Sequence, residues 1–261
     1  MAKKLFALTL VIFIFLVGCD KTVIIDGKTS STPSVSDKAY ATQTVTLPAE
    51  AKDKILNYNF GLYGEPDVGE EIAVMHTSMG DFCIRFFPKA APLAVTNFKE
   101  LATGGYYNGI IFHRVIEDFM IQGGDPTGTG YYGDSCWSHA FNDEFSTDAR
   151  NFRGAFSMAN AGANTNGSQF FVVQLDTVTD DLISQMQQIP SRFSSEVIDV
   201  YRQYGGTPSL DYKHTVFGFI FYGMDTVDKI AAVKTDENDK PVEDVVINSI
   251  DIVFYGGVAQ Q

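Results

Sequence analysis

The chain has 261 residues, of which 45% are hydrophobic, 20% charged and 13% aromatic. This composition excludes a disordered chain, a collagen and a multispanning membrane protein. Its 19 basic and 32 acidic residues give a formal charge of −13, whereas proteins that bind a phosphate backbone need a surplus of lysine and arginine. We therefore expect no nucleic acid as a partner. The three cysteines, Cys19, Cys83 and Cys136, are too few for a disulfide scaffold and lack the spacing of a structural zinc site.

Residues 1–18 have the pattern of an export signal. Two lysines precede the apolar run LFALTLVIFIFLV at residues 5–17, which is too short to span a bilayer comfortably as a helix. The Gly18-Cys19 step that follows resembles the lipobox of bacterial lipoproteins, which implies cleavage before Cys19 and a lipid anchor on it. A plain secretory signal or an uncleaved anchor helix is the alternative. We expect a protein attached to a membrane of the bacterial cell envelope on its extracytoplasmic side, in the periplasm or at the cell surface.

The rest of the chain divides into three parts. Residues 19–51 are rich in Ser, Thr, Lys and Pro without a sustained apolar period, which predicts a flexible tether. Residues 52–70 carry enough apolar side chains to pack on a domain and are predicted as an N-terminal extension. Residues 71–256 are predicted as the globular domain.

Short β-like runs dominate this domain. A hairpin is predicted over residues 71–87, and a helix over 90–103 with Pro92 in its first turn. Many strands with few helices between them indicate an antiparallel sheet, closed into a barrel. The stretch 177–204 predicts a two-helix insertion, and 227–233 a further short helix. The other β-like runs are 109–115, 119–122, 155–158, 169–173, 216–221 and 245–254.

Three stretches carry candidate chemistry. FHRVIEDFMIQGGD, at residues 112–125, places Arg114 among large apolar residues, with Gln122 on the same side if the strand is unbroken. SMANAGANTNGSQFF, at 157–171, is a loop of small and amide residues whose backbone can approach a peptide closely. LDYKHTVFG, at 210–218, sets a histidine just before a strand.

These three stretches, in this order, resemble the signature stretches of the cyclophilin family of peptidyl-prolyl cis/trans isomerases. The likeness covers about residues 71–254, interrupted by the stretch 177–204. It implies a mainly β fold, a closed antiparallel eight-stranded barrel capped by two helices, with Xaa-Pro-containing polypeptides as substrates. No cofactor and no metal are implied, because rotation about a C–N bond breaks no covalent bond.

The resemblance also implies roles for particular residues. The catalytic positions of the family fall on Arg114, Gln122 and Asn160, with Gln122 expected to orient Arg114. A structural ion pair is the alternative role for Arg114, and simple packing at the groove rim is the alternative for His214. The substrate-binding positions fall on Phe119, Met120, Ala159, Ala161, Gln169, Phe171, Leu210 and His214.

The expected function is catalysis of Xaa-Pro rotation that accelerates the folding of exported proteins, by a monomer. A proline-peptide binding module or holdase on the same scaffold is the alternative. Eukaryotic cyclophilins commonly carry a tryptophan that helps to bind cyclosporin at the position of Ser209, so we expect weak inhibition by cyclosporin. The GxGxxG run at residues 128–133 lacks a strand-loop-helix frame, which predicts a flexible loop rather than a nucleotide site.

Overall fold

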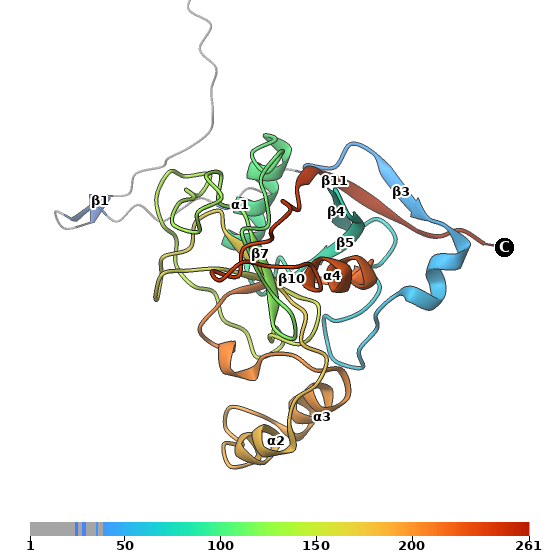
Figure 1. Cartoon of the computed structure of the whole chain (residues 1–261), viewed down its shortest axis with the longest axis vertical. Helices are drawn as coiled ribbons and strands as arrows, with labels where there is room; N and C mark the ends of the chain where they lie inside the picture. Colours follow the sequence, from blue (N-terminus) through green and yellow to red (C-terminus); the bar gives the residue numbers. More distant parts are fainter. Residues whose placement is uncertain (1–23, 26–27, 30–34, 36–38, 261) are drawn as a thin grey trace, which may run out of the picture. The chain divides into compact units, whose positions relative to one another are not determined.

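The computed structural model describes residues 24–25, 28–29, 35 and 39–260, in two units, Met1–Ser34 and Val35–Gln261. In the first unit, β1 (Ile24–Ile25) and β2 (Lys28–Thr29) pair antiparallel. The predicted signal segment and Cys19 lie outside the described residues. All other described elements belong to the second unit, which is built on one large sheet (Figure 1).

The large sheet has nine strands in the order β3-β11-β4-β5-β10-β8-β9-β7-β6. Neighbouring strands pair antiparallel, except that β3 runs parallel to β11. The strands are β3 (Thr44–Leu47), β4 (Glu71–Thr77), β5 (Gly80–Phe86), β6 (Arg114–Ile116), β7 (Met120–Gly123), β8 (Ala155–Met158), β9 (Phe170–Val173), β10 (Val216–Tyr222) and β11 (Ile247–Val258).

The prediction of a closed eight-stranded barrel was wrong in strand number and in closure. The extra strand is β3, and the order of strands has two ends, at β3 and β6. Near the β6 end, Gly109 N donates to Ile247 O at 2.8 Å and Phe112 N to Val245 O at 2.9 Å. These bonds fall ahead of β6 and around the start of β11, so they bring the two segments together without forming a strand ladder.

Within the described residues, four α-helices accompany the sheet: α1 (Pro92–Thr103), α2 (Asp180–Gln187), α3 (Ser195–Tyr204) and α4 (Met224–Ala231). Helices α1 and α4 pack on strands of the sheet. Pro92 occupies the first turn of α1, where its missing N–H is harmless and its fixed φ suits a helix. The predicted short helix at 227–233 is α4, which starts three residues earlier than predicted.

Helices α2 and α3 lie within the stretch predicted as an insertion, and they sit side by side away from the strands (Figure 1). Each begins with a side-chain cap. Thr179 Oγ1 accepts from Leu182 N at 3.3 Å, and Ser194 Oγ accepts from Val197 N at 3.4 Å. Such caps satisfy backbone donors that a helix start leaves unpaired.

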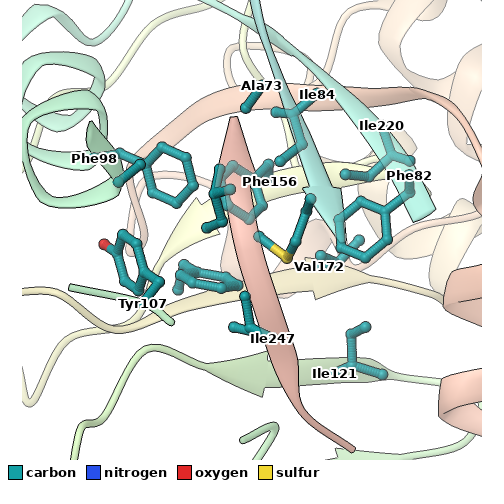
Figure 2. Close-up of a cluster of buried hydrophobic side chains, with 14 of the residues drawn as sticks. Ala73, Phe82, Ile84, Phe98, Tyr107, Ile121, Phe156, Val172, Ile220 and Ile247 are labelled. Atoms are coloured by element: carbon teal, nitrogen blue, oxygen red, sulfur yellow. The ribbon is translucent and has the colours of Figure 1, made fainter. Parts of the chain in front are cut away.

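An aromatic cluster fills the space between α1 and the sheet (Figure 2). Phe98 of α1 meets Phe156 of β8 edge to face, with ring centroids 5.0 Å apart, and stacks on Tyr107 at 5.1 Å. All three side chains are fully buried. Aromatic pairs of this geometry add stability beyond the area they bury.

The N-terminal part of the second unit is folded, in contrast to the predicted tether. Strand β3 pairs with β11, and it is followed by the short 3-10 helix η1 (Ala49–Lys54). The backbone N–H groups of Tyr40 and Ala41 donate to Glu71 Oε1 at 2.6 and 2.7 Å. The tether prediction is therefore wrong for residues 40–51, which pack on the domain.

Residues 52–70, predicted as an extension, contribute a second aromatic cluster. Tyr58 and Tyr63 are buried, and the Tyr58 ring stacks on Tyr204 at the end of α3 with centroids 4.0 Å apart. The extension thereby contacts the helical insertion.

Among helices of the described ranges, none is long and apolar enough to cross a membrane.

Candidate active site

The β6–β7 hairpin positions the arginine singled out by the sequence. Arg114 of β6 lies directly opposite Gln122 of β7 in the register of the pair. The connecting turn needs a positive φ, which Asp118 adopts at 58°, and Asp118 N donates to Gln174 Oε1 at 2.9 Å. Aspartate tolerates this left-handed conformation better than most residues, so a short turn fixes the register that pairs Arg114 with Gln122.

The guanidinium of Arg114 remains accessible. Its side chain is 42% exposed, and its Nε lies 3.6 Å from Asp239 Oδ2, a carboxylate that is itself 46% exposed. An ion pair this long and this exposed contributes little to stability. A purely structural role for Arg114 is therefore a poor account of its position, and its donors are available to a ligand.

A buried apolar floor lies next to this arginine. Met120 of β7 and Phe171 of β9 are 2% and 4% exposed, and Gln122 pairs with Phe171 across the sheet. The half-buried Phe119 ring lies with its centroid 6.0 Å from Arg114 Cζ. The large apolar side chains can hold a small ring, and the guanidinium beside them can donate a hydrogen bond to an acceptor atom of that ring.

The ring of His214 borders the apolar floor next to Phe171 and forms a wall of the site, the His214 wall. Its ring meets the Phe171 ring edge to face, with centroids 5.2 Å apart. Its Nδ1 lies 3.0 Å from Met158 O, and because a carbonyl only accepts, Nδ1 carries the hydrogen. Burial lowers the pKa of His214, and the bond to Met158 O opposes this only in part. The ring is therefore neutral near pH 7.

A cleft of about 350 Å³ lies next to the apolar floor and is called the second cleft, the floor being the first part of the site. Gln122 Nε2 donates to Gln169 Oε1 at 2.9 Å, and Gln169 Nε2 donates to Gly130 O and Tyr132 O at 3.0 and 2.8 Å. The Nε2 of Gln122 is thus directed to Gln169, and the expectation that Gln122 orients Arg114 stays a prediction. Ala159 and Ala161 also line the cleft, and their small side chains leave room for a peptide.

Asn160 joins the amide-rich loop to the segment that carries His214. Its Nδ2 donates to Lys213 O at 2.9 Å and lies 3.4 Å from Asp143 Oδ1. The side chain is thus engaged within the protein, and it fixes the distance between the second cleft and the His214 wall. Leu210, one turn before His214, is half-buried and packs against the same apolar cluster as Phe171.

The loop at residues 127–133 is held in place, in contrast to the predicted flexible loop. Asp125 accepts from Thr127 N, Gly130 N and Tyr132 N at 2.8, 2.6 and 3.3 Å. Burial alone would raise the pKa of Asp125, but these hydrogen bonds hold it below its ordinary value. A Cβ at Gly167 would lie 2.1 Å from Gly133 O, so this loop and the amide-rich loop touch backbone to backbone.

Sequence reasoning missed two residues of this loop. Tyr131 and Tyr132 are 88% and 63% exposed and line the second cleft, so two aromatic rings stand at its rim. The available signal was Asp125 followed by Thr and Gly residues, a composition typical of loops capped by a carboxylate.

Within the described ranges, no group of three or more His, Cys, Asp or Glu side chains is placed to hold a metal ion. Cys83 lies buried in β5, and burial raises its pKa to about 12, so it remains a thiol.

The family model for the cyclophilin type peptidyl-prolyl cis-trans isomerases matches residues 72–252, which is more than half of the chain. The chain belongs to the cyclophilin family. A Staphylococcus aureus (strain USA300) protein named "Putative peptidyl-prolyl cis-trans isomerase" is 53% identical to this cyclophilin over 188 residues, which cover 72% of this chain and 94% of the relative. A Staphylococcus epidermidis protein of the same name is 50% identical over 193 residues, covering 72% and 97%.

Solved structures agree with this assignment. A Cryptosporidium parvum cyclophilin type peptidyl-prolyl cis-trans isomerase has a TM-score of 0.57 and 32% identity, covering 70% of this chain and 96% of that one. The same protein in the presence of the dipeptide Ala-Pro has a TM-score of 0.56 at 32% identity, covering 69% and 98%. This cyclophilin is a peptidyl-prolyl cis-trans isomerase, and the binding-module alternative is not favoured.

The neutral state of His214 predicts a pH dependence of stability. The pKa of this histidine is lower in the folded than in the unfolded state, so the unfolded state binds the proton more tightly. The free energy of unfolding is therefore highest above about pH 6.5 and falls as the pH drops below it. His113, whose pKa burial also lowers, has the same sign. We expect His214→Gln to flatten part of this slope between pH 5 and 7 in urea unfolding, leaving the part due to His113. A wild-type slope in the variant would contradict the neutral assignment.

Proposed function

We propose that Arg114 stabilises the twisted Xaa-Pro amide while Phe119, Met120 and Phe171 hold the proline ring. The observation that carries this proposal is the β6–β7 register, which places an accessible guanidinium beside a buried apolar floor. The substrate segments on either side of the proline would lie in the second cleft and along the His214 wall.

The chemistry needs only these groups. Resonance in the amide makes a barrier of about 18–20 kcal/mol to rotation about the C–N bond. As the bond twists, the lone pair localises on the prolyl nitrogen, which then accepts a hydrogen bond that the planar amide cannot accept. A donor fixed at this nitrogen stabilises the transition state more than the ground state, and such differential binding is what accelerates a reaction.

The magnitude of this bond limits what Arg114 alone supplies. A charge-assisted hydrogen bond is worth roughly 1.5–3 kcal/mol. The remainder of the acceleration comes from the pocket, which holds the ring while the preceding carbonyl swings. Gln122, Gln169 and Asn160 support the second cleft, where amide and backbone groups bind the peptide ahead of the bond. His214 acts as a neutral apolar wall and not as an acid.

A protease-coupled assay on a Xaa-Pro tetrapeptide tests the proposal. Enzyme far below the substrate concentration is expected to convert all of the cis peptide faster than the uncatalysed tens to hundreds of seconds. Acceleration that ends after one equivalent of peptide has reacted would indicate a binding module instead.

We also propose that this cyclophilin is an exported lipoprotein, anchored through Cys19 on the extracytoplasmic side of the cell envelope, where it acts on exported polypeptides as a monomer. The apolar run at residues 5–17 and the cysteine directly after it support this proposal. Because the domain begins to pack at Tyr40, residues 20–39 are proposed as the spacer between the anchor and the domain. The chain's acidity gives little attraction to anionic headgroups, so the lipid supplies the attachment.

Labelling of cells with a radioactive lipid precursor checks the anchor. The wild-type chain is expected to take up label and to sediment with membranes, whereas Cys19→Ser is expected to lose both properties. Cys83→Ser is the matched control, because that thiol is buried in β5 and should not be lipidated. Label on the Cys19→Ser chain would refute the anchor.

A further inference from the structure

The helical insertion builds a second pocket beside the proposed proline site. This insertion pocket, of about 250 Å³, lies between α2 and the short 3-10 helix η2 (Pro208–Leu210). Leu182, Met186 and Phe193 give it an apolar lining, and Ile189, which is 46% exposed, stands at its mouth. An apolar recess of this size fits one side chain of a peptide and no large cofactor.

The insertion pocket and the proline site share the segment of residues 208–214. Ser209 lines the pocket, while the next residue, Leu210, packs on the buried cluster that also contains Phe171. Lys213 lines the pocket, and its backbone carbonyl accepts the hydrogen bond from Asn160. One short segment therefore contributes to both sites, so a peptide bound along the His214 wall can extend toward the pocket.

Two cations at the pocket indicate the charge of its occupant. Arg192 and Lys213 both line the pocket, and neither forms an ion pair with a described residue. Arg192 Nη2 donates to Asp211 O, but its buried Nε has no hydrogen-bond partner. The Arg192 Cζ also lies 5.3 and 5.6 Å from the Phe193 and Tyr212 ring centroids, which hold the guanidinium without neutralising it. In a chain of net charge −13, two cations at one pocket without a carboxylate partner favour an acidic ligand.

The η2 side of the pocket is anchored to α3. The Tyr201 hydroxyl lies 2.9 Å from both carboxylate oxygens of Asp211 and shares its hydrogen with them, which ties α3 to the residue after η2. Tyr204, also at the end of α3, stacks on Tyr58. A pocket already formed before binding loses little conformational entropy when it takes a ligand.

We propose that the insertion pocket is a substrate subsite, which takes an apolar side chain of the same client polypeptide with an acidic residue next to it facing Arg192 and Lys213. This proposal rests on the proposed function, because it extends the same groove. It assigns to the insertion a preference for Xaa-Pro bonds that have an apolar-acidic pair within a few residues.

The test compares a Xaa-Pro tetrapeptide with longer peptides. The longer peptides carry Leu-Glu two to five residues from the proline, on either flank, and each has a Ser-Gln counterpart. At least one Leu-Glu peptide is expected to show a kcat/KM about ten-fold or more above its counterpart. Equal kcat/KM for all pairs would overturn the subsite. No turnover of the tetrapeptide would instead refute the proposed function.

Two variants locate the preference. Ile189→Glu places a charge at the pocket mouth and is expected to bring the ratio of kcat/KM within each pair to about one, with the tetrapeptide unchanged. Ser184→Glu lies on α2, five residues before Ile189, and is exposed and outside the pocket lining; it is the matched control and should keep the wild-type ratio. Two outcomes would overturn the proposal. In one, Ile189→Glu leaves the ratio of kcat/KM within each pair unchanged. In the other, kcat/KM falls equally for the tetrapeptide and the long peptides while the unfolding midpoint stays the same.

Discussion

Replacement of Arg114 by alanine is expected to lower kcat/KM for a Xaa-Pro tetrapeptide by about ten- to 150-fold, the equivalent of one charge-assisted hydrogen bond in the transition state. The effect should fall on kcat, because the bond forms only once the amide has twisted. The free energy of unfolding should hardly change, since Arg114 is half-exposed and lies 3.6 Å from Asp239. A protease-coupled assay and urea unfolding give both quantities.

Two further variants complete this experiment. Arg114→Lys keeps the charge but loses the planar set of donors, so an intermediate rate is expected. Arg202→Ala removes an exposed arginine of α3, paired with Asp199, and should leave the rate unchanged. Wild-type kcat/KM in Arg114→Ala would remove Arg114 from the mechanism.

Replacement of Asp211 by alanine is expected to have the largest effect on stability, a loss of about 3–5 kcal/mol in the free energy of unfolding. Asp211 is 1% exposed and lies 3.4 Å from Arg150 Nη1, and Arg150 is 4% exposed. It also accepts from Asn151 N at 2.8 Å and from the Tyr201 hydroxyl. Removing the carboxylate leaves the buried Arg150 without its counterion, although its Nε still donates to Thr147 O, and leaves the buried donors of Asn151 and Tyr201 without this acceptor.

The controls separate charge from hydrogen bonding. Asp211→Asn keeps an acceptor for Asn151 N, so it should lose less stability than the alanine variant. Tyr201→Phe removes one hydroxyl bond and is expected to lose about 0.5–1.5 kcal/mol. Urea unfolding at pH 7 measures all three, and a loss below about 1 kcal/mol in Asp211→Ala would show that the network contributes little.

The sequence placed Arg114 and Gln122 on one side only for an unbroken strand, and the structure has a turn at Asp118 instead. Because that turn is short, the hairpin register still sets Arg114 opposite Gln122, and alternation along β7 sets Met120 on the floor. The helical periodicity around Pro190 likewise predicted two helices where α2 and α3 lie.

Features that depend on distant contacts could not be predicted in this way. Strand β3 is only four residues long and is fixed by pairing with β11, about two hundred residues later, so the local composition indicated a tether. The partners of Asp211 are likewise separated in sequence, since Arg150 precedes it by 61 residues. The fixed loop at residues 127–133 depends on hydrogen bonds to one carboxylate, which periodicity does not reveal.

In the proposed mechanism Arg114 acts on the transition state and not on peptide binding. Exchange NMR at equilibrium, with a Xaa-Pro tetrapeptide and catalytic amounts of enzyme, measures the dissociation constant and the rate of rotation on the enzyme in one experiment. We expect Arg114→Ala to bind the peptide within a few-fold of wild type while rotation on the enzyme slows by about ten-fold or more. Weakened binding with an unchanged rate of rotation would contradict it.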